Sequence, residues 1–200
     1  MAREDFLGCP VDLVDREGLR RQYAMALAGG ARLRIEGLNV AKVVQARRDP
    51  ELLAALREAE AIHVDGMGVR WGMAIAGMHS GERVAGVDLL MDICAHCAAQ
   101  RRSVYLLGAR QEVAERTAAA LVAAYPALRI AGVRNGYFSE DEWDEVAEAV
   151  RASGADALFV GISSPMKERF LARLWDRLGV QVAMGVGGAF DVIAGDLRRA

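Results

Sequence analysis

The run ALFVGI at residues 157–162 is apolar throughout and has the length of one strand. A strand without polar alternation is typical of a parallel sheet that is covered on both faces. Five further apolar or β-branched runs occur along the chain, separated by longer amphipathic stretches, at residues 32–36, 61–65, 104–108, 129–133 and 180–186. This alternation predicts an α/β fold of Rossmann-like type, with a largely parallel sheet flanked by helices.

Local signals mark where helices begin. Asp49 offers an N-cap before Pro50, and Ser164-Pro165 repeats that signal before a helical pattern at residues 166–178. Residues 139–142, with the sequence SEDE, form a capping box that opens another helix. No repeat or linker interrupts the chain, so we expect one domain over all 200 residues.

The composition limits the partners. The formal net charge is −2, whereas a broad nucleic-acid surface needs an excess of Lys and Arg, so we expect no nucleic-acid partner. No uncharged apolar run reaches the roughly 18 residues of a membrane span, and the N-terminus lacks the apolar stretch of a signal peptide. We therefore expect a soluble, cytoplasmic chain whose three cysteines are free thiols.

Two of the cysteines lie close to a histidine, at Cys94, His96 and Cys97. This spacing can bind a metal or support redox chemistry. The three residues fall inside the amphipathic stretch 87–100, however, away from a helix start and without a second pair of ligands. No Asp-x-Asp follows a predicted strand either, so we expect neither a metal nor a cofactor.

Ligands of parallel α/β sheets bind outside the carboxyl ends of the strands. Asp65 stands at such an end and is followed by Gly66 and Gly68, which leave room beside the carboxylate. A general base could occupy this position. An aspartate that caps a helix or a turn would show the same pattern, and placement alone does not separate the two interpretations.

Glycine-rich segments follow other predicted strands. The strongest is GVGGAFD at residues 185–191, whose backbone N–H groups and following helix could hold a phosphate or a ribose. Leu107-Gly108 and the segment NGYF at residues 135–138 are weaker signals of the same kind. A tight turn without a ligand is the alternative for each of them.

Two cations stand near predicted loops, Arg83 and Lys167. Either could neutralise a diphosphate leaving group, because no metal site is apparent that would do so. Taken singly, each is better interpreted as a solvated surface cation.

The order and spacing of these segments resemble the WecG/TagA/CpsF family, glycosyltransferase family 26, from about Phe6 to Ala200. The resemblance is carried by Asn39 and by DPEL (49–52), VDGMGV (64–69), RVAGVDL (83–89), LLG (106–108), YPAL (125–128), NGYF (135–138) and GVGGAFD (185–191). It implies an inverting, metal-independent transferase. Such an enzyme moves a sugar from a UDP-sugar donor to an undecaprenyl-diphosphate-linked sugar acceptor during assembly of bacterial surface polysaccharides.

The resemblance also implies roles for individual residues. Asp65 matches the catalytic base, and Arg83 and Asn39 match residues that line the same pocket. UDP would lie against the loops after the later strands, which gives a substrate-binding set of Gly66, Gly108, Gly136, Tyr137, Lys167, Glu168, Gly187, Gly188, Phe190 and Asp191.

The chain departs from the family pattern in three places. Gly37 stands where many members carry Thr, and Lys167 replaces an amide, which leaves the donor sugar open. Family members continue past the arginines matching Arg198-Arg199 into a basic, amphipathic segment that contacts the membrane, whereas this chain ends at Ala200. We therefore expect a truncated core of weak activity, whose longer form is peripheral at the inner face of the cytoplasmic membrane. Homo-oligomerisation is compatible with the sequence.

Two other functions are open to this sequence. An NAD-type oxidoreductase would need G-x-G-x-x-G after the first strand, which residues 35–39 do not supply. A nucleotide-sugar-binding module that has lost catalysis is suggested by the changed Gly37 and Lys167. The retained Asp65 argues against it.

Overall fold

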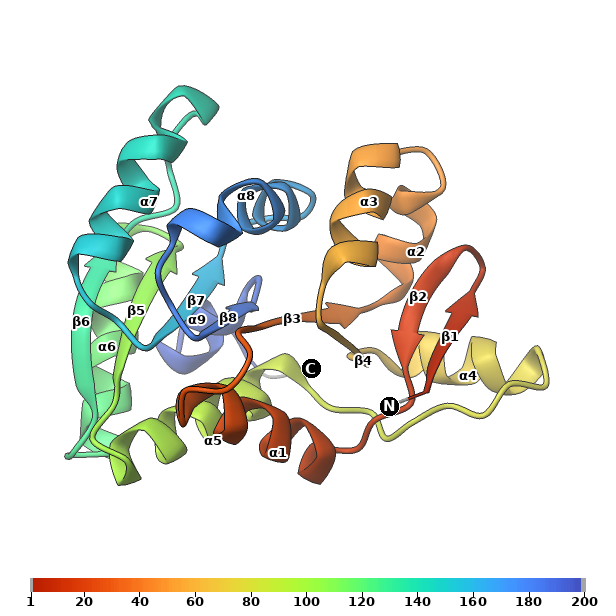
Figure 1. The fold of residues 1–200 in the computed structure, drawn as a ribbon, viewed down its shortest axis with the longest axis horizontal. Coiled ribbons are helices and arrows are strands. Elements are labelled where there is room, and N and C mark those ends of the chain that lie inside the picture. Colours follow the sequence, from red (N-terminus) through yellow and green to blue (C-terminus); the bar gives the residue numbers. More distant parts are fainter. Residues whose placement is uncertain (1, 199–200) are drawn as a thin grey trace.

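The computed structural model describes residues 2–198 and contains a parallel sheet in the strand order β4-β3-β8-β7-β5-β6 (Figure 1). The six strands are β3 (Leu33–Leu38), β4 (Ala61–Val64), β5 (Ser103–Gly108), β6 (Arg129–Arg134), β7 (Ala157–Gly161) and β8 (Val182–Gly185). Every neighbouring pair is parallel. All six predicted strands and the Rossmann-like α/β class are thus confirmed.

Helices cover both faces of this sheet. One face carries α1 (Arg16–Leu27), α5 (Gly86–Ala99), α6 (Gln111–Ala124) and α9 (Ala189–Ile193), which share a core with the strands. The other face carries α2 (Val40–Ala46), α3 (Pro50–Glu58), α7 (Trp143–Ala152) and α8 (Met166–Leu174). Because side chains alternate along a strand, Phe159 packs into the first core and Leu158 into the second.

The helix starts agree with two of the three local signals. The Asp49 carboxylate accepts a hydrogen bond from the Leu52 N–H at 3.0 Å, and Glu142 accepts one from the Ser139 N–H at 2.8 Å, which closes the capping box. The third prediction was wrong in detail. Pro165 itself occupies the N-cap position of α8, so Ser164 does not cap the helix.

Strand and helix ends differ from the predictions by a few residues. β3 continues to Leu38, because its last residues pair with β4, and β8 is shorter at both ends than expected. α8 ends at Leu174, and the expected remainder of that helix is a 3-10 turn, Trp175–Arg177.

An N-terminal hairpin was not predicted. It consists of β1 (Arg3–Phe6) and the antiparallel β2 (Cys9–Asp12). Its turn places Leu7 and Gly8 at φ values of 56° and 90°. The sequence gives little sign of it, because leucine rarely adopts this backbone conformation and Pro10 normally argues against a strand.

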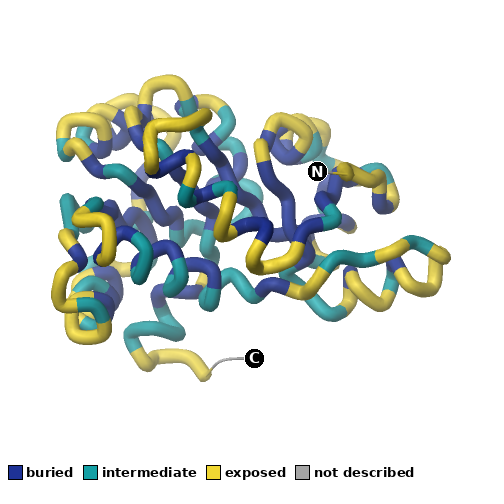
Figure 2. Tube along the Cα trace, turned by 60° about the horizontal axis from the view of Figure 1, so that its bottom comes forward, coloured by how far each residue is buried: buried dark blue, intermediate teal, exposed yellow. Residues whose placement is uncertain are grey.

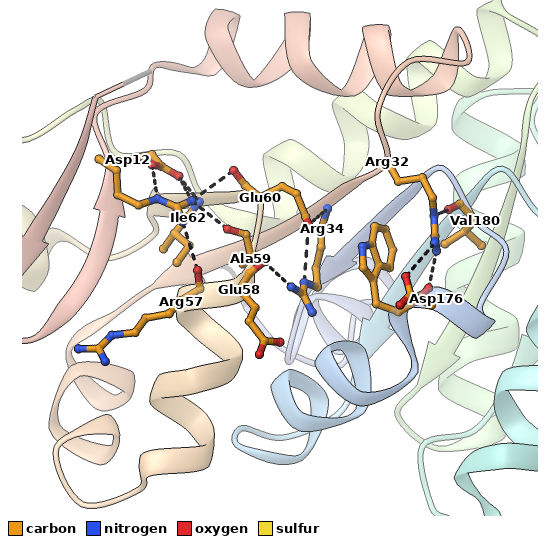
Figure 3. Close-up of polar contacts among 12 residues, drawn as sticks. Asp12, Arg32, Arg34, Arg57, Glu58, Ala59, Glu60, Ile62, Asp176 and Val180 are labelled. Carbon is orange, nitrogen blue, oxygen red and sulfur yellow. Dashed lines mark hydrogen bonds and ion pairs between the residues drawn. The ribbon is translucent and has the colours of Figure 1, made fainter.

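Arginine side chains form hydrogen bonds and ion pairs along the amino-terminal edge of the sheet (Figure 3). Arg3 forms an ion pair with Asp12 at 2.8 Å, and Asp12 accepts a hydrogen bond from the Ile62 N–H at 2.7 Å, which ties the hairpin to β4. Arg32 donates to the Val180 carbonyl at 2.9 Å beside β8. These contacts hold the strands together opposite the edge where ligands of such sheets bind.

The remaining helix, α4 (Met67–Ile75), lies at one end of the molecule and follows β4 directly (Figure 1). None of the helices within residues 2–198 has both the length and the apolar character that a bilayer crossing requires.

Candidate active site

Two pockets lie at the carboxyl edge of the sheet and share Gly187 and Gly188. The smaller one has a volume of about 170 Å³ and is lined from the ends of β3, β4 and β8 and from α2, α5 and α8. Its lining includes Gly37, Asn39, Lys42, His63, Asp65, Gly86 and Lys167. We call it the Asp65 pocket.

The larger pocket, of about 370 Å³, lies where the chain turns in opposite directions after β5 and β7. Parallel sheets bind their ligands at such switch points. Its lining comes from the residues after β5, β6, β7 and β8 and includes Arg110, Gly136, Tyr137, Ser163 and Asp191. We call it the switch-point pocket.

Glycines keep the floor of the switch-point pocket free of side chains. A Cβ on Gly108, whose φ is +147°, would stand 2.4 Å from the backbone of Gly161, and one on Gly136 would stand 2.9 Å from Gly108. The three strand ends therefore approach each other as bare backbone. This arrangement leaves space above the sheet for a flat or extended ligand.

The two carboxylate oxygens of Asp65 have different surroundings. Its Oδ1 accepts a hydrogen bond at 3.0 Å from the N–H of Gly86, the first residue of α5. Within residues 2–198 its Oδ2 accepts no hydrogen bond, and this atom borders the pocket beside Gly37. The helix-capping interpretation and the general-base interpretation are therefore compatible, because each needs only one carboxylate oxygen.

The position of the Asp65 side chain depends on the absence of a side chain at Gly37. A Cβ at position 37 would stand 2.8 Å from the Asp65 Cβ and 3.2 Å from its Oδ2. A threonine in that position would therefore displace the carboxylate from its present place. The glycine at position 37 therefore affects the position of the Asp65 carboxylate, in addition to removing the threonine hydroxyl.

The other predicted catalytic residues lie around Asp65. Asn39 lines the pocket, and its side chain caps α2 by accepting from the Lys42 N–H at 3.0 Å. Arg83 is exposed, and its Nε donates to the Asp65 carbonyl at 3.4 Å. Gly66 is the N-cap of α4, with the Asn39 Cβ 3.5 Å from where its own Cβ would be.

A buried cluster of four charges lies behind the Asp65 pocket. Lys42 is 2.9 Å from Glu36 and 2.8 Å from Glu168, and Lys167 also contacts Glu168. All four side chains are nearly inaccessible. Two cations and two anions balance each other there, which is how buried charges are normally tolerated. We call these residues the charge cluster.

The cluster shifts the pKa values of its members. Burial favours the neutral form of Lys42, but Glu36 and Glu168 outweigh it and raise the pKa of Lys42. Burial and the neighbouring Lys42 together lower the pKa of Lys167. Burial would raise the pKa of Glu168, yet the two lysines hold it at about 2.

His63 completes the wall of the Asp65 pocket. Its imidazole is fully buried, and burial lowers its pKa. Within residues 2–198 neither ring nitrogen has a hydrogen-bond partner. Sequence reasoning missed Glu36, Lys42 and His63. Glu36 and His63 lie in strands that are buried on both faces, where a charged residue or a histidine is itself a signal that a partner is needed. Lys42 lies in α2 and gives no such signal.

The predicted substrate-binding residues separate into three groups. Gly66 stands alone, because it is the N-cap of α4 and lines neither pocket. Most line one of the two pockets or lie directly under it: Gly108, Gly136, Tyr137, Lys167, Gly187, Gly188 and Asp191. Glu168 and Phe190 are buried behind the pocket walls instead, Glu168 in the charge cluster and Phe190 against Gly161. These two side chains support the wall from behind.

Other cavities lie away from the strand ends. One of them, of about 650 Å³, is lined by α1, residues 13–15 and residues 79–82. Cys94 and Cys97 lie on the buried side of α5, where burial raises the pKa of both thiols, to about 12 for Cys97. We place the candidate site at the carboxyl edge because a strand-end carboxylate and a glycine floor lie next to each other there.

The fold and the candidate site define a Rossmann-like α/β protein with a carboxylate in one of two pockets at the carboxyl edge of its sheet. The chain belongs to the glycosyl transferase WecG/TagA/CpsF family, which it matches over residues 4–200.

Two curated relatives from Bacillus carry the same name, N-acetylglucosaminyldiphosphoundecaprenol N-acetyl-beta-D-mannosaminyltransferase. The protein from Bacillus spizizenii is 31% identical over 156 residues, which cover 78% of this chain and 60% of that protein. The protein from Bacillus subtilis is 26% identical over 153 residues, which cover 76% of this chain and 59% of that protein. The chain thus matches about 60% of the length of these relatives.

Proposed function

We propose that this chain transfers a sugar from a UDP-sugar donor to an undecaprenyl-diphosphate-linked sugar, by an inverting reaction that uses no metal. The names of the two relatives support an N-acetylglucosaminyl-diphosphoundecaprenol acceptor. The observation that carries the proposal is the pair of pockets joined at Gly187 and Gly188, with the Asp65 carboxylate in one and a glycine floor in the other.

The reaction needs a base on one side of the donor sugar and a leaving group on the other. The Oδ2 of Asp65 takes the proton of the acceptor hydroxyl while that oxygen bonds to the anomeric carbon. The bond from the anomeric carbon to the diphosphate oxygen breaks on the opposite face, and its electron pair leaves with UDP. General-base assistance of this kind contributes about 10²–10⁴-fold in rate.

The leaving diphosphate needs compensating charge or N–H donors. In our proposal the diphosphate lies over Gly187 and Gly188, between the two pockets, and the uridine occupies the switch-point pocket. Gly187 has a φ of +51°, and a Cβ on Gly188 would meet nothing within 4 Å, so a ligand can approach this backbone closely. Lys42 and Lys167 line the Asp65 pocket and Arg110 lines the switch-point pocket, and in our proposal Lys167, with the exposed Arg83 beside Asp65, supplies the positive charge.

Calorimetric titration with UDP, NAD and a panel of UDP-sugars tests the class. We expect binding of UDP and of at least one UDP-sugar, without binding of NAD. Transfer from the bound UDP-sugar to N-acetylglucosaminyl-diphosphate lipid should then follow without added metal and in the presence of EDTA. Binding of NAD without UDP would refute the proposal.

Lys167→Gln is expected to weaken UDP binding by about tenfold or more, because a hydrogen bond to a charged group contributes about 1.5–3 kcal/mol. The same change should alter the preference among donor sugars. Arg173→Gln, on the same helix but facing the groove between α3 and α8, is the matched control and should leave UDP binding unchanged. Unchanged donor kinetics in Lys167→Gln would assign this lysine to the charge cluster alone.

A further inference from the structure

The exposed side of α4 is apolar. Trp71 is 63% and Ile75 is 88% exposed, and the helix contains no acidic residue. Both views place this helix at one end of the molecule, with much of its surface in contact with solvent (Figures 1 and 2). A helix that is apolar on its outer side as well as its inner side is normally covered by something.

The apolar surface continues onto α2. Val40 packs on α4 at Gly68, where a Cβ would stand 2.6 Å from the Val40 side chain. Trp71 and Ile75 lie one and two turns further along the same side of α4. Val40 is 50% and Val44 is 55% exposed, one turn apart on α2. We call Val40, Val44, Trp71 and Ile75 the α2–α4 face.

Unpaired positive charge surrounds this face. Arg70 precedes Trp71 on α4, and Arg47 and Arg48 follow α2, one turn beyond Val44. All three are exposed, and none forms an ion pair within the part of the chain that the structure describes. α2 also contains no acidic residue. Apolar side chains flanked by arginines are complementary to an anionic lipid surface.

The α2–α4 face is close to the proposed base. α4 begins two residues after Asp65, and Asn39, which lines the Asp65 pocket, immediately precedes α2. A helix of nine residues spans only about 13 Å at the α-helical rise of 1.5 Å per residue. The acceptor sugar of the proposed reaction is attached to its lipid through a diphosphate, so its hydroxyl stays near the bilayer surface.

We propose that the α2–α4 face docks onto an anionic lipid bilayer and presents the Asp65 pocket to the lipid-linked acceptor. This inference rests on the proposed function for its acceptor. A second copy of the chain fits the face less well than a bilayer. A symmetric dimer through this surface would gather the arginines of both copies in one interface, with no acidic side chain from α2 or α4 to balance them.

The first experiment uses Trp71 as its own probe, on vesicles of phosphatidylglycerol and phosphatidylethanolamine with brominated acyl chains. Trp143 is buried, and Trp71→Phe identifies the contribution of the other tryptophans. We expect bromine to quench the Trp71 emission and this emission to shift to the blue. Absence of both changes with the wild-type chain would overturn the proposal.

The second experiment compares vesicle partition of paired variants. Replacing Trp71 and Ile75 by Gln should lower partition by about tenfold or more, because two large apolar side chains no longer leave water. The control replaces Met25 and Val122 by Gln, which are exposed on the other helix layer, and should change partition less than twofold. Arg70→Gln should lower partition about fivefold on anionic vesicles and not on phosphatidylcholine.

Two further readouts separate the outcomes. The Trp71 and Ile75 variant should keep full transfer to a water-soluble, short-chain acceptor and lose transfer to the vesicle-bound one. If the wild type transfers to neither acceptor but its Trp71 is still quenched by brominated lipid, the proposed function fails and the docking surface stands. A variant that only converts a dimer into a monomer, with unchanged vesicle partition, would overturn docking in favour of self-association.

Discussion

Asp65→Asn is expected to lower kcat by about 10²–10⁴-fold, which corresponds to about 3–5 kcal/mol of transition-state stabilisation. The amide keeps an oxygen that accepts the hydrogen bond from the Gly86 N–H, so the start of α5 stays capped. It cannot take a proton from the acceptor hydroxyl. We therefore expect unchanged UDP affinity by calorimetry and an unchanged free energy of unfolding, with the loss confined to turnover.

Asp65→Ala separates the two roles of this carboxylate. It removes both oxygens, so it should lose turnover to the same extent and also about 1 kcal/mol of stability through the lost cap. The difference in unfolding free energy between the two variants measures the cap alone. Full turnover in Asp65→Asn would show that Asp65 only holds the start of α5.

The strands could be predicted from the sequence because they are buried on both faces. Runs such as residues 157–162 have no polar alternation, and the amphipathic stretches between them fix the α/β class. The hairpin of β1 and β2 could not be predicted in the same way. Its short strands are held by the contacts of Asp12 with Arg3 and Ile62, which come from packing against β4 and not from a local pattern.

The candidate site was predicted in part. The rule that ligands bind at strand ends selected Asp65, Gly136 and Gly187, all of which line the two pockets. The charge cluster could not be predicted, because Lys42 contacts Glu168, and Glu36 contacts Lys42, from distant parts of the chain. A pattern in the sequence shows that a charge is present but not what balances it.

The same limit applies to the proposed docking surface. The family resemblance assigned the membrane contact to a segment after Arg198-Arg199, of which Arg199 lies outside the described residues. The α2–α4 face is assembled from two short helices that meet at Gly68. Neither helix is long enough for its pattern to reveal such a surface.

Lys42→Met is expected to lower the free energy of unfolding by about 3–5 kcal/mol, because it leaves two buried carboxylates with a single cation. For a chain of this size the loss corresponds to a drop in Tm of roughly 10 °C or more. Lys167→Gln should cost less, since burial and the neighbouring Lys42 already disfavour the charged form of Lys167 and lower its pKa. Thermal and urea unfolding of both variants measure the difference.

The effect of Lys42→Met should depend on pH in a defined direction. The lysines hold the pKa of Glu168 at about 2, below its ordinary value of 4.5. A lowered pKa stabilises the fold above the ordinary value, and this contribution is lost as the pH falls from about 4.5 through about 2. Without Lys42 the pKa of Glu168 rises toward its ordinary value, so the difference between wild type and variant should be largest at neutral pH and shrink in acid.

A double variant tests whether charge balance is the cause. Replacing both Lys42 and Glu36 by Met removes one cation and one anion, and the remaining Lys167 and Glu168 still form a neutral pair. Exchange of a buried ion pair for apolar side chains is often neutral or stabilising, so the double variant should recover much of the stability that Lys42→Met loses. If the double variant recovers none of the lost stability, the unbalanced carboxylate is not the cause of the loss, and the charge cluster does not explain why this lysine is buried beside the Asp65 pocket.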